Sequence, residues 1–395
     1  MTNKTLLQFL LLFLLTPAIQ YAQQWDTLSP IPERFTFPVV TVLDGQIHIM
    51  GGGGTGGATD LHFAYDKLTD TWESKAPVPY KAQQPAGAAA NGKIHFFGGG
   101  FPTSGQPLDS HYVYDPASDS WAAAAKLTQA RAIHYAVALD DVLYSLAGQG
   151  VANLCQTYDP VNDAWITKNN LPDNQFWYGA HVATEGHIYR FGGGGYTAPR
   201  NLAHKYDPVN DSWSALPALP NATHAIKGAA IGDKIYLLGG YYDFEERTEC
   251  WVFDTQTNSY TPCEPLPVGR DYHNVVSLDS CIYTIGGNHA LYPDVSYQLL
   301  RLCPYLTSST GEAKTTGSIV PYYESGILYL NMSQQIHGEY NLSVFDLSGR
   351  QILANKLNVE TGVVTEVLTG KLIPSVYCIQ LSGKEGRFTG KFVAK

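Results

Sequence analysis

A glycine run near the N-terminus has the spacing of a loop that could hold a pyrophosphate. Gly51, Gly53 and Gly56 in HIMGGGGTGG fit the pattern G-x-G-x-x-G, which binds dinucleotides when it lies between a strand and a helix. An apolar, strand-like stretch does precede the run. The segment that follows Gly57, HFAYD, however, has the composition of a second strand. Without a helix N-terminus to hold the phosphate, the glycines need another explanation.

Three arginines occupy matching places ahead of apolar stretches and could bind an acidic group. Arg131 and Arg270 are each followed three residues later by a histidine, His134 and His273, and Arg34 stands at the equivalent place earlier in the chain. A guanidinium pairs well with a carboxylate, so a shallow anion-binding pocket is one interpretation. The alternative, equally open at this point, is that these arginines support packing between neighbouring elements.

Aromatic and basic residues in the same predicted loops complete the candidate binding set. Aromatic rings there could stack on a sugar or grip a peptide, or they could simply fill gaps in the packing. The remaining candidates are His224, Trp177, Tyr178, Tyr196, Arg200, Tyr241 and Tyr242.

The chain offers little sign of metal or nucleophilic chemistry. His134, His181, His224 and His273 could converge as ligands, but no His-x-x-x-His or Cys-x-x-Cys spacing supports this. Asp-x-x-x-Asp pairs recur in four of the five predicted hairpins, which favours turn stabilisation over calcium binding. There is no G-x-S-x-G elbow. We therefore expect no cofactor, no metal and no catalytic residue, and an enzyme is the less favoured interpretation.

A repeat explains the glycines. IHIMGG at 47–52 returns as IHFFGG, LYSLAG, IYRFGG, IYLLGG and IYTIGG, at intervals of roughly 45–50 residues. After each of the first five comes a strand–turn–strand signature, such as VYDPASDSW at 113–121, with turn residues between aromatic-rich segments. Each unit thus predicts four short strands, the pattern of a β-propeller blade.

The double glycine, the Tyr-Asp-Pro and the following Trp resemble the Kelch repeat. The resemblance covers residues 23–306 and implies an all-β fold with six blades. Only five units carry the strand–turn–strand signature, whereas Trp25 stands unmatched at the N-terminal end. We therefore expect the strand near Trp25 to complete the sixth blade and close the ring, which removes an exposed edge.

The N-terminus predicts export. Lys4, the apolar stretch Leu6–Leu15 and the small residues Ala18 and Ala22 are typical of a signal peptide over residues 1–22. Cysteines in an exported chain can form disulfides. Cys250 and Cys263 flank one predicted turn and Cys281 and Cys303 another, so these are the expected pairs, with free thiols as the alternative.

The C-terminal region departs from the repeat. Residues 307–318 are small and polar, typical of a linker, and residues 319–395 predict a small β-sandwich. Leu342–Arg350 (LSVFDLSGR), Ser375–Tyr377 and Lys391–Lys395 (KFVAK) resemble the C-terminal sorting domain of the type IX secretion system of Bacteroidetes-type bacteria. The resemblance implies secretion, or attachment to the outer-membrane surface, in a Gram-negative bacterium, with the secretion machinery as a partner.

Composition and charge narrow the function. A net charge of -10 without a basic stripe argues against nucleic acid, and no segment of the mature chain is expected to span a membrane. We expect a secreted propeller that binds a protein or a carbohydrate at its loop face. The alternative is a carbohydrate-active propeller of the sialic acid mutarotase or epimerase kind.

Overall fold

The computed structural model describes residues 25–172, 177–195, 197–289 and 296–304, together with strands at 319–324, 327–332, 338–345, 351–359, 363–367, 375–383 and 386–394. The predicted signal peptide and linker, residues 1–22 and 307–318, lie outside the described residues.

Six four-stranded antiparallel sheets make up the repeat region. In each sheet the first strand lies nearest the centre, and the other three strands pair one after another towards the outside. In chain order they are β2 (Val39–Leu43), β3 (Gln46–Met50), β6 (His62–Asp66) and β7 (Thr71–Ser74); β8 (Ala86–Ala90), β9 (Lys93–Phe97), β10 (His111–Asp115) and β11 (Ser120–Ala123); β12 (Tyr135–Leu139), β13 (Val142–Gly148), β14 (Ala152–Asp159) and β15 (Ala164–Lys168); β16 (Ala180–Thr184), β17 (His187–Phe191), β20 (Ala203–Asp207) and β21 (Ser212–Ala215); β22 (Lys227–Ile231), β23 (Lys234–Leu238), β26 (Cys250–Asp254) and β27 (Ser259–Pro262); and β28 (Asn274–Leu278), β29 (Cys281–Ile285), β30 (Leu299–Leu302) and β1 (Asp26–Thr27).

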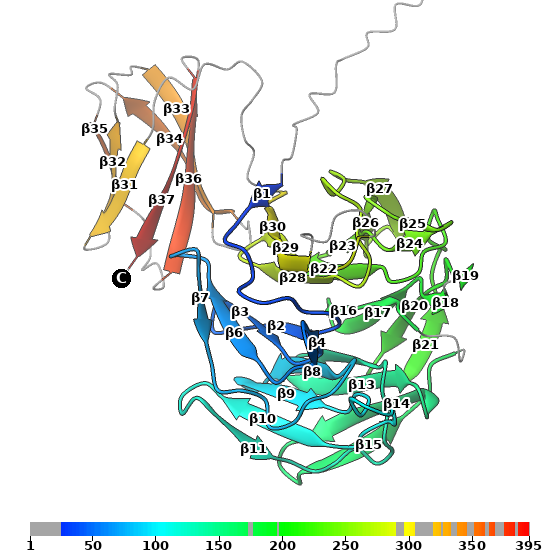
Figure 1. Cartoon of the computed structure of the whole chain (residues 1–395). Coiled ribbons are helices and arrows are strands. Elements are labelled where there is room, and N and C mark those ends of the chain that lie inside the picture. Colours follow the sequence, from blue (N-terminus) through cyan, green and yellow to red (C-terminus); the bar gives the residue numbers. More distant parts are fainter. Residues whose placement is uncertain are drawn as a thin grey trace, which may run out of the picture.

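The sheets are the blades of a six-bladed propeller, as predicted (Figure 1). The first strand of each blade contacts the first strand of the next, and the cycle returns from β28 to β2. The N-terminal strand β1 pairs with β30, with Asp26 opposite Arg301 and Thr27 opposite Leu300. The predicted closure is therefore confirmed: the chain joins its N-terminal strand to the last repeat within one blade, and β1 covers the edge of β30.

The double glycines let adjacent blades approach each other. Gly51 follows β3 with φ of 61°, and a Cβ atom there would lie 2.7 Å from the ring of Phe96 in the next blade. A side chain at Gly51 would therefore meet both a strained backbone and a steric clash. The surplus glycines form a small hairpin, β4 (Gly53–Gly54) with β5 (Gly57–Ala58). No helix follows them, so the phosphate-loop interpretation is excluded by the fold as well.

Four outer hairpins carry two aspartates, and the two have different roles. Asp115 caps its own turn by accepting the Ala117 amide at 3.0 Å, as expected for a tight turn. Asp119 accepts the Tyr114 hydroxyl at 2.7 Å and also the backbone amide of Ala76 in the preceding blade at 2.9 Å. The second aspartate thus joins two blades. The same arrangement recurs at Asp70, Asp163 and Asp211.

The repeated tryptophan also connects neighbouring blades. The indole of Trp121 donates to the Ala76 carbonyl at 2.9 Å, and that of Trp165 donates to the Ala125 carbonyl at 3.0 Å. Each ring contacts the repeat tyrosine of its own blade, with Tyr114 and Trp121 centroids 5.2 Å apart. One side chain therefore supplies both apolar area and a hydrogen bond across the blade interface.

Each of the last two blades contains one disulfide that links two of its own strands. Cys250 in β26 is bonded to Cys263 after β27, and Cys281 in β29 is bonded to Cys303 after β30. These are the pairs that the hairpin positions predicted. Cys155 in β14 is a free, buried thiol.

The C-terminal strands form two antiparallel sheets. One is β31 (Ile319–Glu324), β32 (Ile327–Met332) and β35 (Val363–Val367), and the other is β34 (Gln351–Val359), β33 (Gly338–Phe345), β36 (Ser375–Gly383) and β37 (Gly386–Ala394). The β-sandwich over residues 319–395 and its assignment as a sorting domain remain predictions. Among the described residues, no helix has the length and apolar character needed to cross a membrane.

Candidate functional site

A cavity of about 380 Å³ occupies the centre of the propeller. It is lined by the first strand of every blade and by the residues just ahead of those strands. Small apolar side chains of Ala, Val and Gly make up most of its wall. Lys227 is the single lysine or arginine of the lining, and the lining contains no aspartate or glutamate.

A ring of left-handed residues surrounds the cavity two positions ahead of each first strand. Left-handed backbone is uncommon outside glycine and is informative where it recurs. The six equivalent residues have φ values of 49–63°: Phe37, Gln84, Ile133, Tyr178, Ala225 and Tyr272. All but Ala225 line the cavity. In five of the six blades the local backbone turn thus places one side chain at the edge of the cavity.

Three members of this ring and one histidine form an aromatic rim. The ring centroids of Phe37 and Tyr272 are 4.4 Å apart, and those of Tyr178 and Tyr272 are 5.2 Å apart. His224 contacts Tyr178 at 4.7 Å, receives or donates a 3.0 Å hydrogen bond with the Tyr272 hydroxyl, and is fixed through Nδ1 at 2.7 Å from the Gly194 carbonyl oxygen. Gln84 donates to the Tyr178 hydroxyl at 3.2 Å. These contacts hold the rings of the rim in place.

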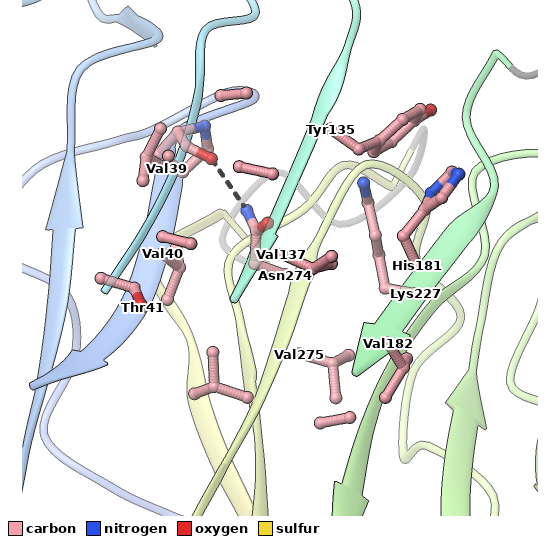
Figure 2. A pocket seen from close by; sticks show the side chains of 18 of the residues that line it. Val39, Val40, Thr41, Tyr135, Val137, His181, Val182, Lys227, Asn274 and Val275 are labelled. Atoms are coloured by element: carbon pink, nitrogen blue, oxygen red, sulfur yellow. Dashed lines mark hydrogen bonds between the residues drawn. The ribbon is translucent and has the colours of Figure 1, made fainter. Parts of the chain in front are cut away.

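Beside the rim lies a polar cluster of Tyr135, His181 and Lys227, contributed by β12, β16 and β22 (Figure 2). Tyr135 and His181 stack with centroids 3.9 Å apart. The Lys227 amine lies 5.3 Å from the Tyr135 ring centroid, and Figure 2 shows it next to the stacked pair, on the side of His181. The Tyr135 hydroxyl and both ring nitrogens of His181 are buried and have no hydrogen-bond partner among the described residues.

Burial sets the protonation of this cluster. Desolvation lowers the pKa of Lys227 to about 8, so its amine still carries a charge at neutral pH. Desolvation, and then the positive charges of Arg190 and Lys227, hold the pKa of His181 well below its ordinary value. Burial raises the pKa of Tyr135. At pH 7 the cluster therefore contains one cation and two neutral groups.

His134 and His273 occupy equivalent positions one residue ahead of β12 and β28, and both line the cavity wall. Burial keeps the pKa of each well below its ordinary value, with a further contribution from the nearby arginine. The His134 ring packs against Phe97 at 5.5 Å. Both are neutral side chains of the wall, and neither approaches a described carboxylate or cysteine cluster that could hold a metal.

The three candidate arginines lie outside the lining of the cavity. Arg131 and Arg270 are fully buried. Arg131 donates to Ser145 at 3.2 Å and to Gln156 at 2.5 Å, and Arg270 donates to Gln298 at 2.7 Å. Arg34 is exposed and lies outside the cavity lining. Arg131 and Arg270 therefore tie the loops ahead of β12 and β28 to strands of their own blades, which is a packing role.

The remaining candidates lie on the loops around the rim. Trp177 is 45% exposed next to Tyr178. Tyr241 and Tyr242 form β24 of a small hairpin with β25 (Glu245–Glu246), and Arg247 covers the Tyr242 ring. Arg200 follows the corresponding hairpin of β18 (Gly194–Gly195) and β19 (Ala198–Pro199). Tyr196 lies outside the described residues.

The surplus glycines border the site. A second hollow of about 270 Å³ is lined by Gly53, Gly54 and Gly57 together with Thr36, Phe37, Gln83 and Gln84. It shares Phe37 and Gln84 with the central cavity. The glycine hairpin therefore leaves open space next to the rim.

Sequence reasoning missed Phe37, Tyr272, Tyr135 and Lys227. None belongs to a recognisable motif, because each is a single residue at the start of a blade. The signal was nevertheless present in the repeat: once the double glycines are aligned, positions 37, 178 and 272 coincide and all three are aromatic.

Six antiparallel blades around a cavity, closed by the N-terminal strand, define the chain as a six-bladed β-propeller. The double glycines and the Tyr–Asp–Trp hairpins repeated through its blades make it a Kelch-repeat propeller, which the comparisons support.

The chain spans about a third or less of the length of the curated relatives described here, and its similarity to the solved structure shows the fold alone. Kelch-like protein 26 of Danio rerio is 23% identical over 212 residues, which is 51% of this chain and 35% of that protein. Kelch-like protein 36 of Mus musculus is 27% identical over 145 residues, 36% of this chain and 23% of that protein. The solved structure of YjhT superposes with a TM-score of 0.60 at 14% identity, covering 69% of this chain and 95% of that one. No family model matches the chain.

Proposed function

We propose that the protein is an exported Kelch propeller that binds a carbohydrate at the aromatic rim of its central cavity. The observation that carries the proposal is the group of Phe37, Tyr178 and Tyr272, whose rings meet at the cavity edge, where the buried His224 contacts Tyr178 and Tyr272. Flat apolar faces beside polar donors are suited to the mixed surface of a sugar ring. Three of these positions lie in the left-handed turn that every blade has ahead of its first strand, and all three line the cavity.

Replacing rim residues tests this proposal. Ala225 occupies the same left-handed position in its own blade with φ of 57°, so alanine is compatible with this backbone. We expect Tyr272→Ala and Phe37→Ala each to weaken binding about tenfold, which corresponds to about 1.4 kcal/mol. A glycan array followed by isothermal titration of the best ligand measures the effect.

The matched control is Val161→Ala, an 89% exposed residue of an outer hairpin. It should leave affinity unchanged. Unaltered affinity in both rim variants, or an array without any bound glycan, would refute the carbohydrate proposal. A pull-down that then recovers a protein partner through the same rim residues would favour the protein-binding alternative.

A second candidate is a carbohydrate-active propeller of the mutarotase kind. The cluster of Tyr135, His181 and Lys227 favours it, because ionisable groups lie beside the rim where a sugar would sit. The absence of a carboxylate from the described cavity lining counts against it. Proton NMR of sialic acid anomers decides the case, since an exchange rate unchanged by the protein removes this candidate.

We further propose that the chain reaches the cell exterior through a type IX secretion route. The tail motif LSVFDLSGR supports the route, and the two disulfides favour an oxidising compartment. The test compares the full chain with a truncation after residue 318 in a type IX-competent host. Equal appearance of both in the medium would contradict the proposal.

A further inference from the structure

The cavity contains a positive charge that nothing in its wall neutralises. Lys227 forms no ion pair or hydrogen bond with any described residue, and its contact with the Tyr135 ring leaves its N–H groups free to donate. Four other blades place Val39, Ala86, Ala180 and Asn274 at the same position, the first residue of the inner strand. A blade therefore does not need lysine there.

The groups around the amine are able to donate hydrogen bonds and carry no negative charge. The Tyr135 hydroxyl and both His181 ring nitrogens form no hydrogen bond of ordinary geometry with a described residue, and the backbone of Gly179 lies close to both side chains. His224, whose ring is held by Gly194 and Tyr272, and His273 also lie within electrostatic range of the amine. The buried carboxylate of Asp271, adjacent to Tyr272, is not part of the cavity lining.

We propose that Lys227, Tyr135 and His181 form a binding site for a single carboxylate group inside the cavity. The ammonium of Lys227 supplies the charge, and the Tyr135 hydroxyl and a His181 N–H supply neutral donors to the two oxygens. The space of about 380 Å³ admits a group of a few atoms, and the small wall residues do not obstruct it. The carboxylate belongs either to a free small organic acid or to an acidic sugar held at the rim.

The site predicts a defined pH dependence. Lys227 is flanked by Tyr135 on β12, by His181 on β16, and by Tyr178, His224, Tyr272 and His273 on the loops ahead of β16, β22 and β28. The histidines with depressed pKa values are neutral above pH 7. Only the loss of the Lys227 charge, as pH rises through its pKa of about 8, should then weaken binding in the pH 7–9 interval.

NMR of the whole protein with ¹³C-labelled lysine ε-carbons tests the site, with acetate as the first probe. Saturating acetate should raise the Lys227 pKa by about one unit, and Lys227→Met should reduce acetate affinity at least tenfold. Lys126→Met, which removes an exposed lysine next to Asp109, should change neither. Lys227→Asn, which copies the residue of the sixth blade, repeats the test should the methionine variant unfold.

Comparing glucuronate with glucose separates the two sources of the carboxylate. If glucuronate displaces acetate and no longer binds the Lys227→Met variant, the carboxylate belongs to an acidic sugar. If acetate binds and glucuronate does not compete with it, the carboxylate belongs to a free acid. An unshifted Lys227 pKa, or equal acetate binding by wild type and Lys227→Met, overturns the inference. Glucose bound through Tyr272 in that case would leave the proposed carbohydrate function standing.

Discussion

At the scale of single residues, a polar side chain in this propeller has a role set by what faces it. Arg131 is buried with Gln156 and Ser145 as neutral partners, whereas Lys227 faces the cavity and has no ion pair or hydrogen bond with a described residue. A buried donor that is fully hydrogen-bonded stabilises the fold, and a free charge beside a cavity remains available to a ligand. Arg131 therefore has a structural role and Lys227 a binding role, although Arg131 precedes the first strand of its blade and Lys227 begins that of its own.

Removing Arg131 should destabilise the fold without a specific effect on ligand binding. Arg131→Met leaves Gln156 and Ser145 without their donor inside the protein, and each orphaned group costs about 1–3 kcal/mol. Urea denaturation should show a loss of this size. Arg34→Met, at an exposed position, should stay within about 0.5 kcal/mol of wild type. A stable Arg131→Met protein that no longer binds ligand would contradict the structural role.

At the scale of elements, the blades are variations on one design that differ in how they fill their centre. In the first two blades the second and third strands meet through histidine pairs, His48 with His62 and His95 with His111, each at 2.9 Å. His62 and His111 also hydrogen-bond to backbone carbonyls. Burial lowers the pKa to about 3 for His48 and His95 and to about 4 for His62 and His111.

These histidine pairs should make the propeller sensitive to acid. The unfolded chain takes up protons below the ordinary histidine pKa of about 6.5, while the folded chain resists until about 4 or below. The free energy of unfolding should therefore be largest above pH 6.5 and fall as pH decreases from 6.5 towards 4. Each unit of depression is worth about 1.4 kcal/mol for one histidine.

Converting one pair to the arrangement of another blade tests this. The equivalent positions of the fourth blade carry Tyr189 and Ala203, so His95→Tyr combined with His111→Ala should flatten the pH dependence of urea unfolding between pH 4 and 6.5. His187→Ala, at a partly exposed position, serves as the control. An unchanged slope in the double variant would show that other groups cause the acid sensitivity.

At the scale of the whole molecule, the ring depends on its seam. The sixth blade takes three strands from the C-terminal end of the repeat and its fourth, β1, from the N-terminal end. Trp25 is 7% exposed, packs with Leu300 and Leu302, and donates to the Glu264 carbonyl at 3.3 Å. Asp26 and Arg301 add an ion pair across the same strands. Closure therefore rests on a few residues far apart in sequence.

Truncating the seam tryptophan should weaken the entire ring. Trp25→Ala removes a large buried side chain, a change that costs about 3–5 kcal/mol. Thermal unfolding should shift to lower temperature and lose cooperativity as the first and last blades separate. The 45% exposed Trp177 provides the matched control, since Trp177→Ala should leave the transition in place. Equal transitions for both variants would mean that β1 does not hold the ring closed.

The repeat alone determined the fold class, the blade number, the closing strand and the cysteine pairs. Each follows from local periodicity: a double glycine, a turn and an aromatic at fixed spacing predict the same four strands wherever they recur. The site did not follow in the same way. Arg131 and Arg270 were candidates because they align in sequence, yet alignment says nothing about which way a side chain points.

Only the tertiary structure decided what meets at the centre. Closing six blades brings residues 37, 135, 178, 181, 227 and 272 around one cavity, although they come from five different blades. The rim and the unneutralised lysine are therefore products of ring closure. The opening glycines show the same division: their positive φ and tight packing could be anticipated from the repeat, whereas the hollow that they leave beside Phe37 exists only because the neighbouring blade forms its other wall.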